Sequence, residues 1–418
     1  MNHPRGIIAI MGSGETTDSM VRVHRYLLGK LPQPVKAVFV DTPAGFQANA
    51  DDLYEKSKEY FGKHLQQSLE QVSFKSTKNI SAFEREKAIL TLKDAGYIFV
   101  GPGSPTYALK NWAGTPIPQI ISDRIQNGAC FIAASAAALT TGKFTVPVYE
   151  IYKVGEEIHW VEGLNLLGLF GLPLIVIPHW NNAEGGTHDT RFCYLGETRL
   201  VQMEAMLPVQ TPILGVDEHT ACIFDFQERQ VLIRGVGGVT VRRQGKETFF
   251  RDGETLPLED FRKFAGLAEG QNIPEPYRPE AQKRASEPFM AQIRDFQDSF
   301  EKSLREHRGD AVVDAIISFD KMMWRSCQGL EDDDRISQGR EALREMIVKL
   351  GLRFDEAPPD IPGVIAPLLD ILLDIRGKLR EAKMWSLADR MRDRLLQAGI
   401  VVEDTPEGSR WRMKAEKV

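Results

Sequence analysis

Short apolar runs that alternate with helical stretches occupy the chain up to about residue 255, and they constrain its fold most. Several of these runs are apolar on both faces, which is typical of strands buried in a parallel sheet. The runs span Gly6–Met11, Val35–Val40, Tyr97–Val100, Cys130–Ala133, Leu174–Ile177 and Thr211–Val216. This pattern predicts an α/β domain over residues 1–265, with a mostly parallel sheet and helices on both of its faces.

A second domain is expected, because a chain of 418 residues exceeds the size at which one core usually stops growing. Residues 266–286 include GQNIPEPYRPEAQKRAS, a stretch rich in proline and polar residues that predicts a linker. Residues 287–418 carry apolar residues at three- and four-residue spacing, the periodicity of amphipathic helices. The sequence therefore predicts a mainly α-helical C-terminal domain.

Composition excludes several classes of protein. The formal net charge is −6, so the whole molecule is not an electrostatic nucleic-acid binder. The four cysteines form no CxxC pair, which excludes a zinc ribbon or redox motif, and their sparse use predicts a cytoplasmic protein. No apolar run reaches the length of a membrane span, and the N-terminus has no signal-peptide pattern, so no membrane partner is expected.

Ser135 is the candidate nucleophile. It lies in the segment CFIAASAAAL, where an apolar strand runs into a serine between very small residues. A nucleophile on a tight strand-to-helix turn needs small neighbours because the backbone there is crowded. Small residues around a serine are also typical of close helix–strand packing, so this segment alone leaves both interpretations open.

Three further residues extend this hypothesis. His179 follows the end of a predicted strand, where a general base is well placed, although a structural histidine gives the same pattern. Gly103 lies in GPGSP, a loop that can offer a backbone N–H to an oxyanion or can be an ordinary tight turn. Glu150, between serine and histidine in sequence, is a candidate to orient the imidazole, with a solvated surface glutamate as the alternative.

Six motifs follow one another in a fixed order between residues 5 and 245: IIAIMGSGE, GPGSPTYALK, AASAAAL, PHWNNAEGGTHDTR, LGVDEHTACIF and VGGVTV. In this order they resemble the serine peptidase family that contains dipeptidase E and cyanophycinase. The resemblance implies a class I glutamine-amidotransferase-like fold and hydrolysis of a small peptide or related amide substrate, with no cofactor.

The same resemblance assigns roles to single residues. It implies a triad in which His179 deprotonates Ser135 while Glu150 holds the imidazole. It also implies an oxyanion hole formed by the backbone N–H groups of Gly103 and Ala136.

Ala133 and Ala137 depart from the family pattern, because they replace the two glycines that flank the usual nucleophile turn. Alanine adds a methyl group and disfavours positive φ, so the turn is expected to be re-shaped. The alternative function is therefore a catalytically inactive protein that keeps the fold and binds a small molecule or RNA.

Competing assignments exist near the predicted base. His188 is a rival base and Asp189 a rival acid. A metal site would have to combine His179, His188, Asp217 and His219, but these residues show no HExxH or comparable spacing, so no metal is predicted.

The C-terminal sequence carries a second set of motifs. It contains REAKMWSLADRMRD followed by GIVVEDTPEGSRWR. This passage resembles the C-terminal end of cysteinyl-tRNA synthetases, densely from Leu369 to Arg412 and more loosely over residues 330–418. None of the synthetase's nucleotide-binding or zinc-binding motifs occurs, so aminoacylation is excluded.

The resemblance of this end region implies contact with tRNA. Residues 376–418 contain 11 Lys and Arg against 7 Asp and Glu, and such side chains neutralise phosphates while an aromatic ring stacks on a base. The candidate RNA-binding residues are Arg390, Arg394, Arg410, Trp411 and Arg412. The alternative is a packing or dimerisation module, with a homodimer as the assembly and the tryptophan serving the module's own small core.

Overall fold

The computed structural model describes residues 5–78, 80–208, 211–267, 287–326, 334–355, 361–381, 383–397, 400–405 and 408–413. The chain forms two compact units, Met1–Val348 and Lys349–Val418. Apart from Gly266 and Leu267, the predicted linker at residues 266–286 lies outside the described residues.

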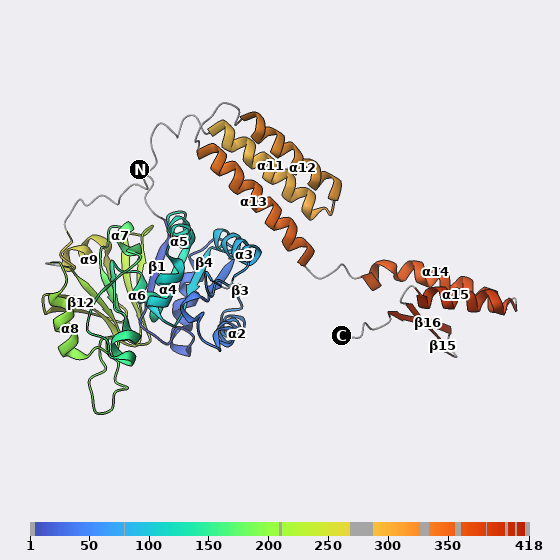
Figure 1. Cartoon of the computed structure of the whole chain (residues 1–418). Helices are drawn as coiled ribbons and strands as arrows, with labels where there is room; N and C mark the ends of the chain where they lie inside the picture. Colours follow the sequence, from blue (N-terminus) through green and yellow to red (C-terminus); the bar gives the residue numbers. More distant parts are fainter. Residues whose placement is uncertain are drawn as a thin grey trace. The chain divides into compact units, whose positions relative to one another are not determined.

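An eight-stranded sheet forms the centre of the N-terminal α/β region (Figure 1). Its strand order is β14-β11-β10-β1-β5-β4-β2-β3. The strands β1, β5, β4, β2 and β3 run parallel, and β10, β11 and β14 add an antiparallel edge. The prediction of a mostly parallel central sheet is therefore confirmed. The bounds are Ile7–Met11 (β1), Ala37–Val40 (β2), Leu69–Val72 (β3), Tyr97–Val100 (β4), Cys130–Ala134 (β5), Thr220–Asp225 (β10), Gln230–Gly235 (β11) and Thr255–Pro257 (β14).

A second sheet of four strands has the order β13-β12-β9-β8. Strands β8 and β9 run parallel, and β12 and β13 are antiparallel. Two of the apolar runs expected in the central sheet thus belong to this smaller one. Its bounds are Ile175–Ile177 (β8), Ile213–Val216 (β9), Gly238–Arg243 (β12) and Lys246–Arg251 (β13), and a two-stranded ribbon joins Phe144–Thr145 (β6) to Val161–Glu162 (β7).

Helices cover both faces of the central sheet (Figure 1). Alternate side chains of β1 enter two separate cores, because successive residues of a strand point to opposite faces. Ile8 and Ile10 pack with α3, α4 and α5, whereas Ile7, Ala9 and Met11 pack with α1 and α2. The helices are Val21–Gly29 (α1), Ala50–Tyr60 (α2), Ala82–Lys93 (α3), Pro105–Trp112 (α4), Ile117–Gln126 (α5), Ala136–Thr140 (α6), Leu166–Leu169 (α7), Gly196–Ala205 (α8) and Leu258–Phe264 (α9).

The C-terminal region is mainly helical, as predicted. It contains Glu287–Arg305 (α11), Gly309–Ser326 (α12), Asp334–Asp355 (α13), Ile361–Glu381 (α14) and Trp385–Gln397 (α15), followed by the antiparallel hairpin of Ile400–Thr405 (β15) and Gly408–Met413 (β16). Helices α14 and α15 pack with the hairpin around a small apolar core. Among the helices that the structure describes, none has the length and apolarity needed to cross a bilayer.

Candidate active site

Ser135 stands on a sharp turn between β5 and α6. Its backbone has φ 52° and ψ −115°, a conformation that costs free energy for a residue with a side chain and is found mainly where the surroundings enforce it. The N–H of Ser135 donates to the carbonyl of Met11 on the neighbouring strand, at 3.1 Å. Ala133 and Ala137 are both buried beside this turn. The strained turn therefore forms with alanine at both positions.

His179 follows β8 and contacts the serine directly. Its Nε2 lies 2.9 Å from Ser135 Oγ, and its Nδ1 lies 2.9 Å from Oε1 of Glu218. An Nδ1–H that donates to the Glu218 carboxylate leaves Nε2 as the acceptor for the serine hydroxyl. Serine, imidazole and carboxylate thus form one continuous series of hydrogen bonds.

Glu218 follows β9, the strand that pairs with β8. Its Oε1 also accepts a hydrogen bond from Asn182 Nδ2 at 3.1 Å, and its backbone N–H donates to Asn181 Oδ1 at 2.8 Å. Burial acts to raise the pKa of Glu218, but the hydrogen bonds from His179 and Asn182 outweigh burial and hold the pKa below its ordinary value. The carboxylate is therefore kept ionised beside the imidazole.

Glu150 does not reach the imidazole, which corrects the assignment made from sequence. It lies in the π-helical turn Glu150–Val154, and its Oε1 accepts a hydrogen bond from Thr106 Oγ1 at 2.6 Å. The position expected for Glu150 is taken by Glu218. The signal for Glu218 was present in LGVDEHTACIF, since an acid directly after a strand lies at the same edge of a sheet as a histidine after the adjacent parallel strand.

Gly103 and Ala136 lie at the ends of adjacent strands, β4 and β5. Gly103 has φ 144°, and a Cβ built there would lie 2.1 Å from the carbonyl oxygen of Pro43, so the loop accepts only glycine. The N–H of Ser104 fixes this loop by donating to the same Pro43 oxygen at 2.8 Å. Ala136 is the first residue of α6, where a backbone N–H has no partner within the helix. Ala136 therefore follows Ser135 directly, and Gly103 lies in the loop after the strand that neighbours β5.

The rival residues are engaged elsewhere. The carboxylate of Asp189 accepts hydrogen bonds from Arg191 Nε and Nη2, both at 2.9 Å, and this pairing lowers the pKa of Asp189. His188 Nε2 faces the hydroxyl of Tyr152 at 3.4 Å. Within the described ranges, no group of three or more His, Cys, Asp or Glu side chains is arranged to hold a metal ion.

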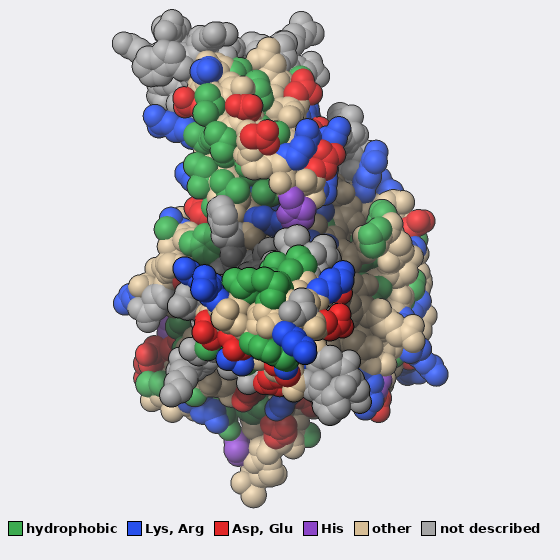
Figure 2. Space-filling model, turned by 90° about the vertical axis from the view of Figure 1, so that its right-hand side faces the viewer, with side chains coloured by type: hydrophobic (Ala, Val, Ile, Leu, Met, Phe, Trp, Pro, Cys, Tyr) green, Lys and Arg blue, Asp and Glu red, His purple; other side chains and the backbone are tan. Residues whose placement is uncertain are grey.

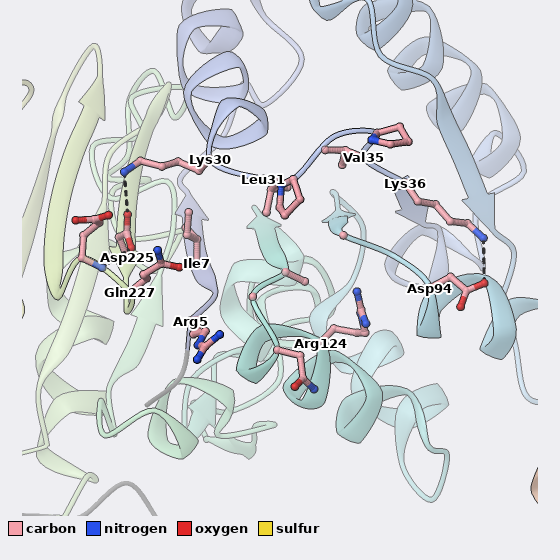
Figure 3. A pocket seen from close by; sticks show the side chains of 17 residues that line it. Arg5, Ile7, Lys30, Leu31, Val35, Lys36, Asp94, Arg124, Asp225 and Gln227 are labelled. Atoms are coloured by element: carbon pink, nitrogen blue, oxygen red, sulfur yellow. Dashed lines mark hydrogen bonds and ion pairs between the residues drawn. The ribbon is translucent and has the colours of Figure 1, made fainter. Parts of the chain in front are cut away.

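A cavity of about 630 Å³ opens at the amino ends of the parallel strands of the central sheet (Figure 3). Its lining includes the starts of parallel strands, such as Ile7, so it lies away from the carboxyl ends that carry Ser135. Two of its lysines form ion pairs, Lys30 with Asp225 at 3.6 Å and Lys36 with Asp94 at 3.8 Å. This cavity shares no residue with the hydrogen-bonded series at Ser135.

The C-terminal hairpin is held by a buried arginine. Arg376 donates to both carboxylate oxygens of Asp404, at 2.6 and 3.0 Å, and to Ser409 Oγ at 2.9 Å, with only 1% of its surface exposed. Such bidentate pairing fixes geometry as well as contributing energy. It joins α14 to both strands of the hairpin.

The candidate RNA-binding residues divide into two groups. Arg390, Arg394 and Arg410 are exposed, whereas Trp411 is partly buried and packs against the small core of the module. The side chain of Arg412 lies outside the described atoms. On the face that Figure 2 shows, Lys and Arg side chains are interspersed with Asp and Glu rather than gathered in one basic area.

A strained serine turn, with a histidine and a carboxylate in series at the carboxyl ends of strands, is an arrangement similar to that of α/β serine hydrolases. The comparison with family models is more specific: the chain belongs to peptidase family S51, whose model matches residues 8–232. A solved peptidase from an acI-B1 Actinobacterium has the same fold, with a TM-score of 0.50 and 19% identity, over 62% of this chain and 98% of that one.

The C-terminal part of the chain is similar to cysteine–tRNA ligases. The ligase of Carboxydothermus hydrogenoformans is 28% identical over 144 residues, which are 34% of this chain and 30% of the ligase. That of Desulfitobacterium hafniense is 47% identical over 82 residues, 18% of this chain and 17% of the ligase. The chain thus spans less than a third of the length of these relatives.

Proposed function

We propose that the N-terminal domain hydrolyses a short peptide or related amide through Ser135, His179 and Glu218. One observation carries this proposal: Ser135 Oγ lies 2.9 Å from His179 Nε2 while the serine backbone holds a strained positive φ. A residue whose backbone is strained and whose side chain is hydrogen-bonded to a candidate base is typical of a functional site.

The proposed reaction proceeds in two halves. His179 takes the proton from Ser135 Oγ as the oxygen attacks the substrate carbonyl, and the oxyanion forms at the N–H groups of Gly103 and Ala136. His179 then gives its proton to the leaving amine, which departs and leaves an acyl ester on the serine. A water molecule, deprotonated by His179, attacks this ester, releases the acid and restores the serine hydroxyl. Glu218 keeps Nδ1 protonated and stabilises the imidazolium.

Labelling with a fluorophosphonate probe tests the proposal. The wild type is expected to react at Ser135, Ser135→Ala to show no labelling, and His179→Ala to react at least about 10²-fold more slowly, because the hydroxyl then lacks its base. Ser68→Ala, at an exposed serine, is the matched control. An unreactive wild type would favour the non-catalytic binding protein instead.

We also propose that the C-terminal module contacts tRNA. This proposal is supported by its similarity to cysteine–tRNA ligases and by the exposed guanidinium groups of Arg390, Arg394 and Arg410. Filter binding with bulk tRNA at low and moderate salt is expected to show saturable binding that weakens steeply with salt. Arg390→Glu with Arg394→Glu should weaken it. Binding that survives deletion of residues 349–418 would leave the module as a packing or dimerisation unit.

A further inference from the structure

The cavity in Figure 3 lies where the parallel strands begin, at the opposite end of β5 from Ser135. Its volume of about 630 Å³ is typical of small-molecule sites. Most of its lining residues are polar or charged, and an apolar wall between α1 and β2 consists of Leu31, Pro32, Pro34 and Val35. The cavity therefore offers both polar and apolar contacts to a small ligand.

Asp225, the last residue of β10, presents a buried carboxylate to this cavity. Only 2% of its side chain is exposed. Its Oδ1 accepts a hydrogen bond from the backbone N–H of Glu228 at 3.0 Å, but within the described part of the chain its Oδ2 accepts none. The ammonium group of Lys30 lies 3.6 Å from Oδ2, beyond hydrogen-bonding distance. A ligand donor would stabilise this carboxylate, because a buried acceptor without a donor costs free energy.

Three helices end at the cavity. The residues that directly follow α1, α3 and α5 all line it, namely Lys30, Asp94 and Asn127. The carbonyl groups in the last turn of a helix carry partial negative charge, so these ends favour a cation nearby. Together with the carboxylate of Asp225, they indicate that the ligand donor is an ammonium group.

Arg124 and Arg5 supply the opposite charge. Nε of Arg124 donates to the carbonyl oxygen of Ala95 at 2.8 Å, which fixes the position of the guanidinium group. Among the described residues, neither arginine is paired with a carboxylate, and the terminal nitrogens of Arg124 have no acceptor. A guanidinium group binds a carboxylate through parallel N–H donors. The two arginines therefore indicate a carboxylate on the same ligand.

The acceptor and the donors lie on opposite sides of the cavity (Figure 3). Asp225 pairs with Ile7 across β10 and β1, whereas Ala95, which holds Arg124, precedes β4. Strands β1 and β5 run between β10 and β4, so the backbones of these outer two are about 14 Å apart, at about 4.8 Å for each step. A ligand that contacts both sides must carry its two charges at separate ends, as an amino acid or a dipeptide does.

We propose that this cavity binds a zwitterion of the amino-acid class, either a free amino acid or a dipeptide with both ends unmodified. Asp225 accepts hydrogen bonds from the ligand's ammonium group, Arg124 and Arg5 donate to its carboxylate, and the apolar wall contacts its side chain. The site is separate from the serine turn, so binding does not depend on the proposed hydrolysis. The proposed hydrolysis of a short peptide would release compounds of this class.

Calorimetric titration with three matched ligands tests the proposal. The ligands are leucylglycine, its N-acetyl derivative and its C-terminal amide. All titrations use the full chain with Ser135→Ala, so that no ligand is hydrolysed. Leucylglycine should bind saturably, and each blocked form should bind about tenfold or more weakly, because each loses one charge-assisted hydrogen-bonded pair.

Variants in the cavity assign the two ends of the ligand. Asp225→Asn should weaken binding of leucylglycine and its amide by about tenfold and leave the N-acetyl form unchanged. Arg124→Gln should weaken leucylglycine and the N-acetyl form and leave the amide unchanged. Arg5→Gln should act in the same way, and it alters an exposed side chain, so it is expected to fold. Arg22→Gln, at an exposed arginine of α1 outside the cavity, is the control and should change none of the three affinities.

Three results would overturn the proposal. One is the absence of saturable binding of leucylglycine at millimolar concentration. Another is binding that all the cavity variants leave unchanged, which would place the dipeptide elsewhere, such as at the serine turn. The third is tighter binding of inorganic phosphate or putrescine than of leucylglycine, which would replace the zwitterion by a ligand with one kind of charge. Fluorophosphonate labelling of the wild type tests the serine mechanism separately in each case.

Discussion

Glu150 and Glu218 are carboxylates with different surroundings, and this difference decides which of them acts on His179. Glu218 accepts hydrogen bonds from the imidazole and from Asn182, whereas Glu150 accepts one from Thr106. The two side chains therefore predict opposite results in mutagenesis.

We expect Glu218→Gln to lower kcat/KM by about 10²–10⁴-fold, because an amide in place of the carboxylate disfavours the correct imidazole tautomer and leaves the imidazolium unpaired. Glu150→Gln, the matched control, should change kcat/KM by less than about threefold. Hydrolysis of one reporter amide by both variants measures the difference. A larger loss in Glu150→Gln than in Glu218→Gln would restore the assignment made from sequence.

The sequence was sufficient to predict that Ser135 and His179 follow strands, and the structure brings the two together as expected. Their catalytic roles stay predictions. Glu218 was missed because the choice between two carboxylates depends on which strand ends are neighbours. The pairing of β8 with β9 decides this, and those strands are separated in sequence by α8, so local pattern gives no indication of it.

At the level of elements, the loop after β4 depends on Gly103, whose backbone packs closely against the loop after β2. The carbonyl of Pro43 fills the space where a side chain at position 103 would lie. The apolar pattern predicted the strands on either side of this loop, but the close approach of a second loop comes from the parallel pairing of β2 and β4.

Gly103→Ala should slow modification of Ser135 by about 10²–10³-fold, since displacing the loop removes one oxyanion donor. It should also lower the free energy of unfolding by about 1–3 kcal/mol through backbone strain. Gly29→Ala, where an added Cβ would meet no heavy atom within 4 Å outside the surrounding helix backbone, is the control and should leave both quantities nearly unchanged. Normal labelling of Gly103→Ala would show that this loop is not part of the oxyanion site.

The hairpin of the C-terminal module depends on Arg376. We expect Arg376→Met to destabilise the module by about 1–3 kcal/mol, because the variant loses hydrogen bonds to a charged partner. Lys378→Met, which removes only an exposed pair with Asp374, should leave the stability of the module nearly unchanged. Limited proteolysis followed by mass spectrometry locates the cleavage, and equal stability of the two variants would contradict this role.

The same pair makes the module sensitive to acid. The hydrogen bond from Arg376 is the main cause that holds the pKa of Asp404 below its ordinary value of 3.8. A carboxyl whose pKa is lowered by folding stabilises the folded state above the unfolded pKa and loses that contribution as pH falls through the folded pKa. The wild-type module should therefore become protease-sensitive only well below pH 3.8. In Arg376→Met this acid step should be smaller, because only Ser409 and Arg380 still act to lower the pKa of Asp404.

For the whole molecule, the proposed chemistry resides entirely in the N-terminal α/β region. Every member of the hydrogen-bonded series lies between residues 135 and 218, and the family match ends at residue 232. The length of the chain and its change of apolar periodicity predicted two parts with different structures, and the described helices from residue 287 onwards confirm a mainly helical C-terminal region.

A chain ending at residue 267 should accordingly keep the rate of Ser135 labelling within about threefold of the full-length value, because among the described residues neither core of the sheet includes any beyond that point. The same truncation should abolish tRNA binding. If the truncated chain gave a folded circular dichroism spectrum but no Ser135 labelling, the C-terminal region would contribute to the active site.

The catalytic hydrogen bonds cross from one sheet to another. Ser135 follows a strand of the eight-stranded sheet, and His179 and Glu218 follow strands of the four-stranded one. The 2.9 Å contact between serine and imidazole therefore depends on how the two sheets are positioned relative to each other. The contact between imidazole and carboxylate joins residues that follow strands of the same sheet. Heat, pressure or a cavity introduced between the two sheets would separate the nucleophile from its base while each sheet keeps its own hydrogen bonds. Loss of activity would therefore precede unfolding of the domain.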